Sequence, residues 1–344
     1  MPRPTSAPPS IPPRVPGAGA SPGREPGPHA AWSRPSRWRT PAGTARRVAA
    51  SALIALVAVI GVLVLWRVFV LTDHGQAVDQ ASLEGAHIGQ SRLWDLAEPV
   101  LDVVSVGFIA LAILACAVIA VVRRRWGLAA CAAGVLIGAN VTTRVLKVWL
   151  LDRPELGHGA ASNTLPSGHA TAAASVAAAV LLVVPPRARP WAAVLGAGYA
   201  GATGVSTLIG QWHRPADVLA GLLVVLAWGA LACAVLALGV DTADERRPPT
   251  AALPVAAARR ADAAGTRVAL VLLGAATLIS GAIAAVALRQ TWVASDPLSS
   301  RGELLAAYGG GALGIVATAA LVFGVLLVLR RSATSASVRG SGRS

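Results

Sequence analysis

Charged and aromatic residues are both scarce in this chain. Asp, Glu, Lys and Arg make up 13% of its 344 residues, and Phe, Trp and Tyr make up 4%. A soluble domain usually carries about 25% charged residues, so the composition excludes an ordinary soluble protein. Hydrophobic residues reach 55% and the mean hydropathy is +0.62. These values exclude a wholly disordered chain and indicate several helices that cross a bilayer.

Lysine and cysteine are rarer still. Lys147 is the only lysine, so arginine supplies every other fixed positive charge on a side chain. The three cysteines, Cys116, Cys131 and Cys233, all lie inside apolar runs. There cysteine is a small packing residue, and we expect neither a disulfide nor a thiolate metal site.

The net charge of +14 is concentrated in three places. Residues 1–47 carry eight Arg and one Glu, residues 123–125 are three consecutive Arg, and the tail from Arg330 adds four Arg. The rest of the chain is neutral overall. This distribution is typical of a membrane-topology signal, so we expect no nucleic-acid partner.

Eight apolar runs are each long enough, at about 20 residues, to cross a bilayer as a helix. They lie at 48–71, 99–122, 127–151, 168–185, 191–211, 216–239, 267–288 and 304–329. We therefore predict an all-α, polytopic membrane helix bundle with a six-span core at 48–239 and two accessory transmembrane helices at 267–329.

Three arginine-bearing segments flank these spans. Residues 1–47 hold twelve of the 23 prolines and are predicted to form a disordered arm. Residues 240–266 are predicted to be a flexible linker, and residues 330–344 a basic tail. The positive-inside rule places all three segments, and therefore both termini, in the cytoplasm. It places the loops at 72–98, 152–167, 212–215 and 289–303 on the extracytoplasmic side of the membrane. We expect this membrane to be the plasma membrane.

Arg144 and Lys147 lie near the outer end of the third span. They are three residues apart and share one face of a helix. Ionisable groups inside a span are costly, so each is a candidate functional residue. The alternative interpretation is that both long side chains simply reach the membrane interface.

The loop before the fourth span ends in Ser167, Gly168 and His169. Ser167 suits the N-cap of the next helix, and the free N–H groups of a helix N-terminus bind anions. Gly168 lets a ligand approach the backbone closely. An ordinary capped turn with an interfacial histidine is the alternative.

The fifth span leads into His213, and Asp217 follows four residues later. A carboxylate beside a histidine can keep one ring nitrogen protonated and leave the other free to attack an electrophile. The alternative is a turn at the membrane interface that Trp212 anchors.

All three segments fall at outer ends of spans, so a helix bundle can bring them together. Two cations, a helix N-terminus, two histidines and one carboxylate suit phosphoryl chemistry. Because no cluster of acidic residues indicates a metal site, we expect neither a metal nor another cofactor.

These residues resemble the type-2 phosphatidic acid phosphatase superfamily, membrane lipid phosphatases related to the vanadium haloperoxidases. That family has three ordered motifs, Lys-x6-Arg-Pro, Pro-Ser-Gly-His and Ser-Arg-x5-His-x3-Asp. Here they read Lys147-x5-Arg153-Pro154, Pro166-Ser167-Gly168-His169 and Ser206-Thr207-x5-His213-x3-Asp217. The order of the three motifs and the predicted spans carry the resemblance together.

The chain departs from the family pattern at two positions. The first motif is one residue short, which would rotate Lys147 by about 100° if the segment stayed helical. A break before Pro154 would absorb that difference. Thr207 stands where the family usually has a phosphate-binding Arg, and we hypothesise that Arg144 replaces it.

The resemblance implies a role for each matching residue. His213 would attack phosphorus and form a phosphohistidine, and Asp217 would orient it. His169 would protonate the leaving oxygen and then activate water. The residues that would hold the phosphoryl oxygens are Lys147, Arg153, Ser167 and the amide of Gly168, with Arg144 as the hypothesised addition.

The resemblance also implies a metal-independent lipid phosphate or diphosphate phosphatase with its site on the outer face. Prenyl diphosphates, phosphatidic acid and phosphatidylglycerol phosphate all fit as substrates held in the bilayer. One alternative is a lipid phosphotransferase of the same superfamily. Another is a non-catalytic protein that binds or transports lipid phosphates, which the loss of Arg at position 207 favours.

Overall fold

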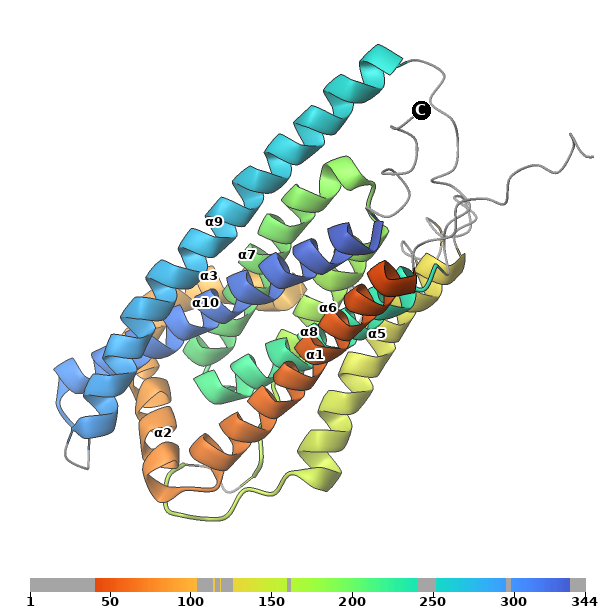
Figure 1. Ribbon diagram of the computed structural model, residues 1–344. Coiled ribbons are helices and arrows are strands. Elements are labelled where there is room, and N and C mark those ends of the chain that lie inside the picture. The colour runs from red at the N-terminus through yellow and green to blue at the C-terminus, as the bar shows by residue number, and fades with distance from the viewer. Residues whose placement is uncertain are drawn as a thin grey trace, which may run out of the picture. The chain divides into compact units, whose positions relative to one another are not determined.

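The computed structural model describes residues 41–103, 114, 118, 126–159, 162–239, 252–294 and 298–334. Most of the predicted arm, most of the span predicted at 99–122, the first half of the predicted linker and most of the basic tail lie outside the described residues. Every regular element within the described residues is a helix, as predicted (Figure 1).

The elements follow one another along the chain as helices of very different length. They are α1 (Pro41–Leu65), η1 (Trp66–Val70), α2 (Asp73–His87), α3 (Gln90–Val103), α5 (Trp126–Val145), η2 (Leu146–Leu150), α6 (Gly168–Val183), η3 (Pro186–Ala188), α7 (Arg189–Ile209), α8 (Pro215–Ala237), α9 (Ala252–Val293) and α10 (Arg301–Thr334). The two elements η1 and η2 are single π-helical turns.

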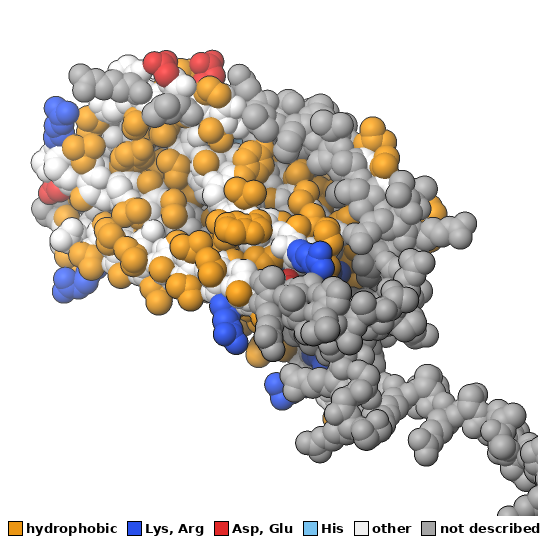
Figure 2. All heavy atoms as spheres, turned by 90° about the horizontal axis from the view of Figure 1, so that it is seen from above, with side chains coloured by type: hydrophobic (Ala, Val, Ile, Leu, Met, Phe, Trp, Pro, Cys, Tyr) orange, Lys and Arg blue, Asp and Glu red, His pale blue; other side chains and the backbone are white. Residues whose placement is uncertain are grey.

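Six helices of the described part are long and apolar enough to cross a membrane. They cover Ala42–Val70, Trp126–Leu150, Pro186–Ile209, Pro215–Ala237, Asp262–Val293 and Arg301–Ala333. Each coincides with one of the predicted spans, and large apolar side chains such as Leu278 stay exposed on them. Figure 2 shows one face of the molecule on which hydrophobic side chains spread broadly. These features make the chain a polytopic membrane protein.

The helix at the predicted fourth span is shorter than expected. α6 has 16 residues, which begin after the N-cap Ser167 and end before Pro185 and Pro186. Thirteen of the 16 are buried by the neighbouring helices. A helix enclosed by protein does not have to match the thickness of the lipid, which accounts for its length.

α8 lies at the centre of the described bundle. It packs against α1, α5, α6 and α10, and most of its residues are buried. A Cβ on Gly221 would lie 2.9 Å from the carbonyl oxygen of Ser167 and 2.9 Å from Oγ1 of Thr171. Glycine therefore lets the N-terminal turns of α6 and α8 approach each other closely.

The two accessory helices are part of the same bundle. α9 runs alongside α10 in Figure 1, and α10 also packs on α7, α8 and α2. α9 begins at Ala252, so the predicted linker at 240–266 is helical over its second half.

The sequence predicts a loop at 72–98, but these residues form α2 and most of α3. Thr72 caps α2 by accepting a hydrogen bond from the N–H of Gly75 (3.1 Å). α2 buries polar side chains, Gln76, Asp79 and Ser82, on one face. A search for long apolar runs cannot detect such a helix, because polar and apolar residues alternate on its inward side.

Gly85 provides a test of how α2 packs on α10. A Cβ there would overlap the backbone carbonyl of Leu304, so Gly85→Ala should lower the free energy of unfolding by about 1–3 kcal/mol. Gly134 on α5 has open space around the same position, so Gly134→Ala should be neutral or stabilising. Thermal unfolding of both variants in detergent checks this, and an unchanged midpoint for Gly85→Ala would contradict the packing.

Candidate active site

The N-terminal ends of α6 and α8 meet at a direct backbone contact. The N–H of Ser167 donates to the carbonyl of Asp217 (2.8 Å), which joins the second and third motifs. Oγ of Ser167 accepts from the N–H of Ala170 (3.3 Å), so this residue caps α6 as predicted. The first-turn N–H groups of Gly168 and His169 follow, a position that suits an anion.

The carboxylate of Asp217 is the hydrogen-bonding centre of the site. Its Oδ2 lies 3.4 Å from Nδ1 of His213 and accepts from Oγ1 of Thr164 (2.7 Å) and from the N–H of Arg214 (3.0 Å). Both Asp217 and His213 are buried. With Nδ1 of His213 facing the carboxylate, Nε2 is the ring nitrogen left for chemistry.

The turn that carries His213 is fixed from two sides. The carbonyl of Thr207 accepts from the N–H groups of Trp212 (3.0 Å) and His213 (3.3 Å). Nε2 of Gln211 donates to the carbonyl of Leu83 on α2 (2.7 Å). The hydroxyl of Thr207 donates to the carbonyl of Gly204 (2.7 Å) and is fully buried. Thr207 therefore positions His213 through its backbone and brings no positive charge.

The structure brings the two motif histidines together. The ring centroids of His169 and His213 lie 5.9 Å apart, and the ring of Trp212 lies 5.2 Å from that of His169. His169 is half-buried at the N-terminal turn of α6. One histidine can therefore exchange a proton with a group that is bonded to the other.

Lys147 lies in the π-helical turn η2, which closes with the N–H of Leu151 donating to the carbonyl of Leu146 (2.9 Å). The chain leaves the helix at Leu151, before Pro154, as the short first motif predicts. Lys147 is half-buried, and its charge interacts with that of Asp217. Arg144 lies one turn earlier with an exposed side chain.

Arg153 is held by α2. Its Nη2 donates to Oε1 of Gln76 (3.0 Å) and to the carbonyl of His158 (3.0 Å). Nε2 of Gln76 donates to the carbonyls of Val70 (2.7 Å) and Pro154 (3.0 Å). The same glutamine thus fixes both the guanidinium and the backbone beside it. Burial and the nearby guanidinium of Arg214 lower the pKa of Arg153.

Asn163 ties the first motif to the second. Its Nδ2 donates to the carbonyls of Leu151 (2.7 Å) and Leu165 (3.0 Å), and its Oδ1 accepts from the N–H of Leu165 (3.1 Å). This side chain replaces backbone pairing in a loop that has no regular structure.

Sequence reasoning missed five residues of the site. They are Gln76, Asp79 and Gln80 on α2, together with Thr164 and Arg214. Two of them could have been found from the sequence, because Arg214 lies inside the third motif and Thr164 lies just before the second. Nothing in the sequence of 72–98 indicates that α2 packs against these motifs.

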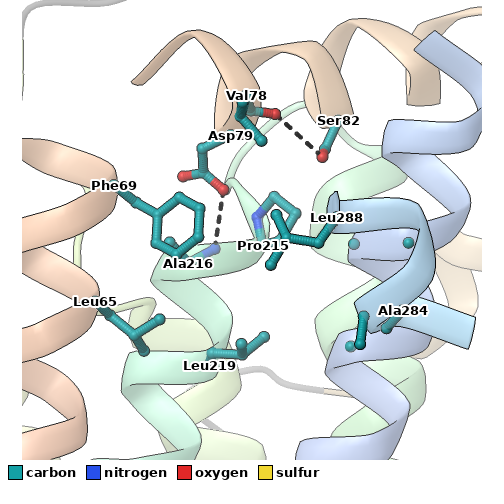
Figure 3. A pocket seen from close by; sticks show the side chains of 14 residues that line it. Leu65, Phe69, Val78, Asp79, Ser82, Pro215, Ala216, Leu219, Ala284 and Leu288 are labelled. Atoms are coloured by element: carbon teal, nitrogen blue, oxygen red, sulfur yellow. Dashed lines mark hydrogen bonds between the residues drawn. The ribbon is translucent and has the colours of Figure 1, made fainter. Parts of the chain in front are cut away.

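A cavity of about 140 Å³ lies against α2 and the start of α8. In Figure 3, the Asp79 carboxylate lies beside Phe69, while Leu65, Leu219, Ala284 and Leu288 form apolar walls. Oδ1 of Asp79 accepts from the N–H of Ala216 (3.1 Å), and its Oδ2 is buried with no hydrogen-bond partner. The cavity is therefore mainly apolar, with Asp79 and Ser82 as its polar lining residues.

No group of three or more His, Cys, Asp or Glu residues in the described part of the chain is arranged to hold a metal ion. Besides the Asp217 carboxylate that pairs with His213, the site holds the N-terminus of α6 and the cation Lys147, which suit an anion.

Residues 128–239 match the PAP2 superfamily, and the match includes all three motifs. This segment is therefore a domain of the PAP2 superfamily, the type-2 phosphatidic acid phosphatase superfamily that the motifs predict. No curated protein and no solved structure matches the chain. α1, α2, α9 and α10 lie outside the matched segment, although α2 contacts the site.

Asp79 makes the stability of the fold depend on pH. Burial, and then the charge of Asp217, raise the pKa of Asp79 to about 7. Between about pH 4 and about pH 7 the folded state holds a proton here that the unfolded chain has lost. The free energy of unfolding should therefore fall as the pH rises through that window, by a few kcal/mol at most.

Asp79→Asn tests this, because the amide keeps an acceptor for Ala216 and does not ionise. The thermal midpoint of the variant, measured against the parent at about pH 5 and about pH 8, should become relatively higher at the higher pH. A constant difference between variant and parent across that range would show that Asp79 does not titrate there.

Proposed function

We propose that this protein is a metal-independent phosphatase of lipid phosphates or diphosphates that works through a phosphohistidine. The observation that carries the proposal is the pairing of His213 with Asp217 beside the N-terminus of α6, with His169 at 5.9 Å. A nucleophile with a carboxylate partner, a second histidine and a helix N-terminus are the components of metal-free phosphoryl transfer.

In the first half of the reaction Nε2 of His213 attacks phosphorus, and the bond from phosphorus to the lipid oxygen breaks. His169 gives its proton to that leaving oxygen. Asp217 stabilises the positive charge that His213 gains, through the 3.4 Å contact at Nδ1. In the second half, water attacks phosphorus, His169 takes its proton, and the P–N bond breaks to release phosphate and regenerate His213.

The phosphoryl oxygens bind to a ring of donors that comes from the first two motifs. Lys147 and Arg153 supply charge from the first motif, and Ser167 with the amide of Gly168 supplies neutral donors from the second. These groups stabilise the negative charge that spreads over the oxygens in the transition state.

The substrate keeps its hydrocarbon part in the bilayer. The site lies at the ends of α5, α6 and α8, which we expect from the arginine distribution to face the outer side of the membrane. The cavity beside Asp79 adds an apolar surface near the site. Prenyl diphosphates, phosphatidic acid and phosphatidylglycerol phosphate share this combination of an anionic head and an apolar tail.

His213→Ala should abolish phosphate release, a loss of several orders of magnitude, because the attacking nitrogen is gone. His87→Ala is the matched control, since His87 is exposed and contacts Gln90 on the surface. Phosphate release in detergent is the measurement, and thermal midpoints show that both variants are folded. Turnover of His213→Ala near the parent rate would refute the assignment.

A substrate panel separates this function from its alternatives. The purified protein is offered prenyl diphosphate, phosphatidic acid and phosphatidylglycerol phosphate, with and without a chelator, and free phosphate is measured. Release that survives the chelator supports the proposal, and loss with chelator contradicts the metal-free mechanism. Phosphorus that appears only in an added lipid acceptor identifies a phosphotransferase. Binding of all three lipids without turnover identifies a binding or transport protein.

A further inference from the structure

Two arginines that α2 holds beside the candidate site, Arg153 and Arg214, have no carboxylate partner. The charge of Arg214 acts on Arg153 more strongly than any other neighbouring charge does. Arg214 is 4% exposed and Arg153 is half-buried. Among the described residues neither guanidinium forms an ion pair with a carboxylate, since the ion pairs found there involve His158, His213 and Arg331.

Neutral groups hold both guanidinium groups in place. Nε of Arg214 donates to Oε1 of Gln80 (3.0 Å), and its Nη1 donates to Oγ1 of Thr164 (3.4 Å). Arg153 donates to Gln76, which precedes Gln80 by four residues. Gln76 and Gln80 therefore lie on the same face of α2, one turn apart, and each orients one arginine.

The two acids whose charges act on Arg153, Asp217 and Asp79, form no ion pair with either guanidinium. Asp217 shares its Oδ2 among His213, Thr164 and the backbone of Arg214. Asp79 is buried with a pKa of about 7, so it is only partly ionised near neutral pH. Buried charges in proteins are normally paired, so a buried and a half-buried guanidinium without an ion-pair partner favour a bound anion.

We propose that Arg214 is a phosphate-binding residue that supplies the cation missing at position 207. The inference rests on the proposed function, because the anion it assigns is the phosphoryl group of the substrate. Arg214 directly follows His213, so its guanidinium is anchored to the same turn as the nucleophile. α2 positions Arg153 and Arg214 as a pair through Gln76 and Gln80, although it lies outside the PAP2 match.

Arg144 is the other candidate for this role, and its surroundings differ. Its side chain is exposed, whereas the side chain of Arg214 is buried beside Gln80 and Thr164. A buried, oriented guanidinium binds an anion more strongly than an exposed one, because it is less screened by solvent and is already ordered.

Orthovanadate, a tetrahedral anion with the shape of phosphate, is the probe. Its Kd for the full-length protein in detergent is measured by titration, and phosphate release from a lipid phosphate is measured in parallel. Arg214→Gln should weaken vanadate binding about tenfold or more, since one charge-assisted contact is lost. The vanadate Kd of Arg214→Lys should lie between those of Arg214→Gln and the parent, because lysine keeps the charge but lacks the planar guanidinium that forms two parallel hydrogen bonds.

Three further proteins sharpen the comparison. Arg187→Gln removes an exposed arginine at the far end of α6 and should leave the vanadate Kd unchanged. Gln80→Ala removes the acceptor that orients Arg214 and should weaken vanadate binding severalfold. Thr207→Arg in the Arg214→Gln background should recover part of the lost affinity. If Arg214→Gln does not fold, Arg214→Lys and Gln80→Ala decide the question.

The outcomes separate this inference from the proposed function. The inference is supported if the parent binds vanadate and Arg214→Gln does not. This holds even if no lipid is hydrolysed and the proposed function fails. If Arg214→Gln keeps the vanadate Kd of the parent while its thermal midpoint falls, Arg214 stabilises the loop without binding the anion. That result overturns the inference. The inference is also overturned if the parent does not bind vanadate. Arg144→Gln is measured alongside, and the inference is overturned if vanadate binding weakens in Arg144→Gln and not in Arg214→Gln.

Discussion

The contact between the N-terminal ends of α6 and α8 is the constraint on which the site depends. The backbone of Asp217 accepts from Ser167, and its side chain faces His213, Thr164 and Arg214. One residue therefore fixes the helix end that suits an anion, the proposed nucleophile and the loop between them. Gly221 is required for this arrangement, because a side chain there would collide with the first turn of α6.

A membrane protein has few buried charges, so the position of each one matters. Here several buried or half-buried ionisable groups gather around the N-terminal ends of α6 and α8. Neutral side chains orient several of them: Thr164 bonds Asp217, Gln76 bonds Arg153 and Gln80 bonds Arg214. Such neutral contacts order a cation or a carboxylate without neutralising it, so its charge remains available to a substrate.

The sequence predicts the helical spans well, because a long apolar run has a single stable form in a bilayer. It also predicts the cap at Ser167 and the break after Lys147, since both depend on local chain chemistry. α2 could not be predicted in this way. Its buried side mixes polar and apolar residues, and only the tertiary contacts of Gln76, Asp79 and Gln80 show why polar side chains point inward. The shortness of α6 likewise depends on the helices that enclose it.

Arg214 illustrates the same limit within a motif that the sequence does display. Its position after His213 is visible in the chain, but the Arg beside it in space, Arg153, is distant in sequence. The chemistry of a residue type is readable from sequence, whereas the partner that gives the residue a role is a property of the fold.

His213 is expected to become phosphorylated during turnover, and trapping that intermediate is the most direct test of the mechanism. The protein is mixed with a lipid phosphate labelled at phosphorus, quenched under alkaline denaturing conditions within the first turnover, and mapped by peptide mass spectrometry. We expect the label on His213. The bond should be labile in acid, as that of a phosphohistidine is, and the label should disappear when unlabelled substrate is added before the quench. Turnover of the labelled lipid without label on His213, or with label on another residue, would contradict the mechanism.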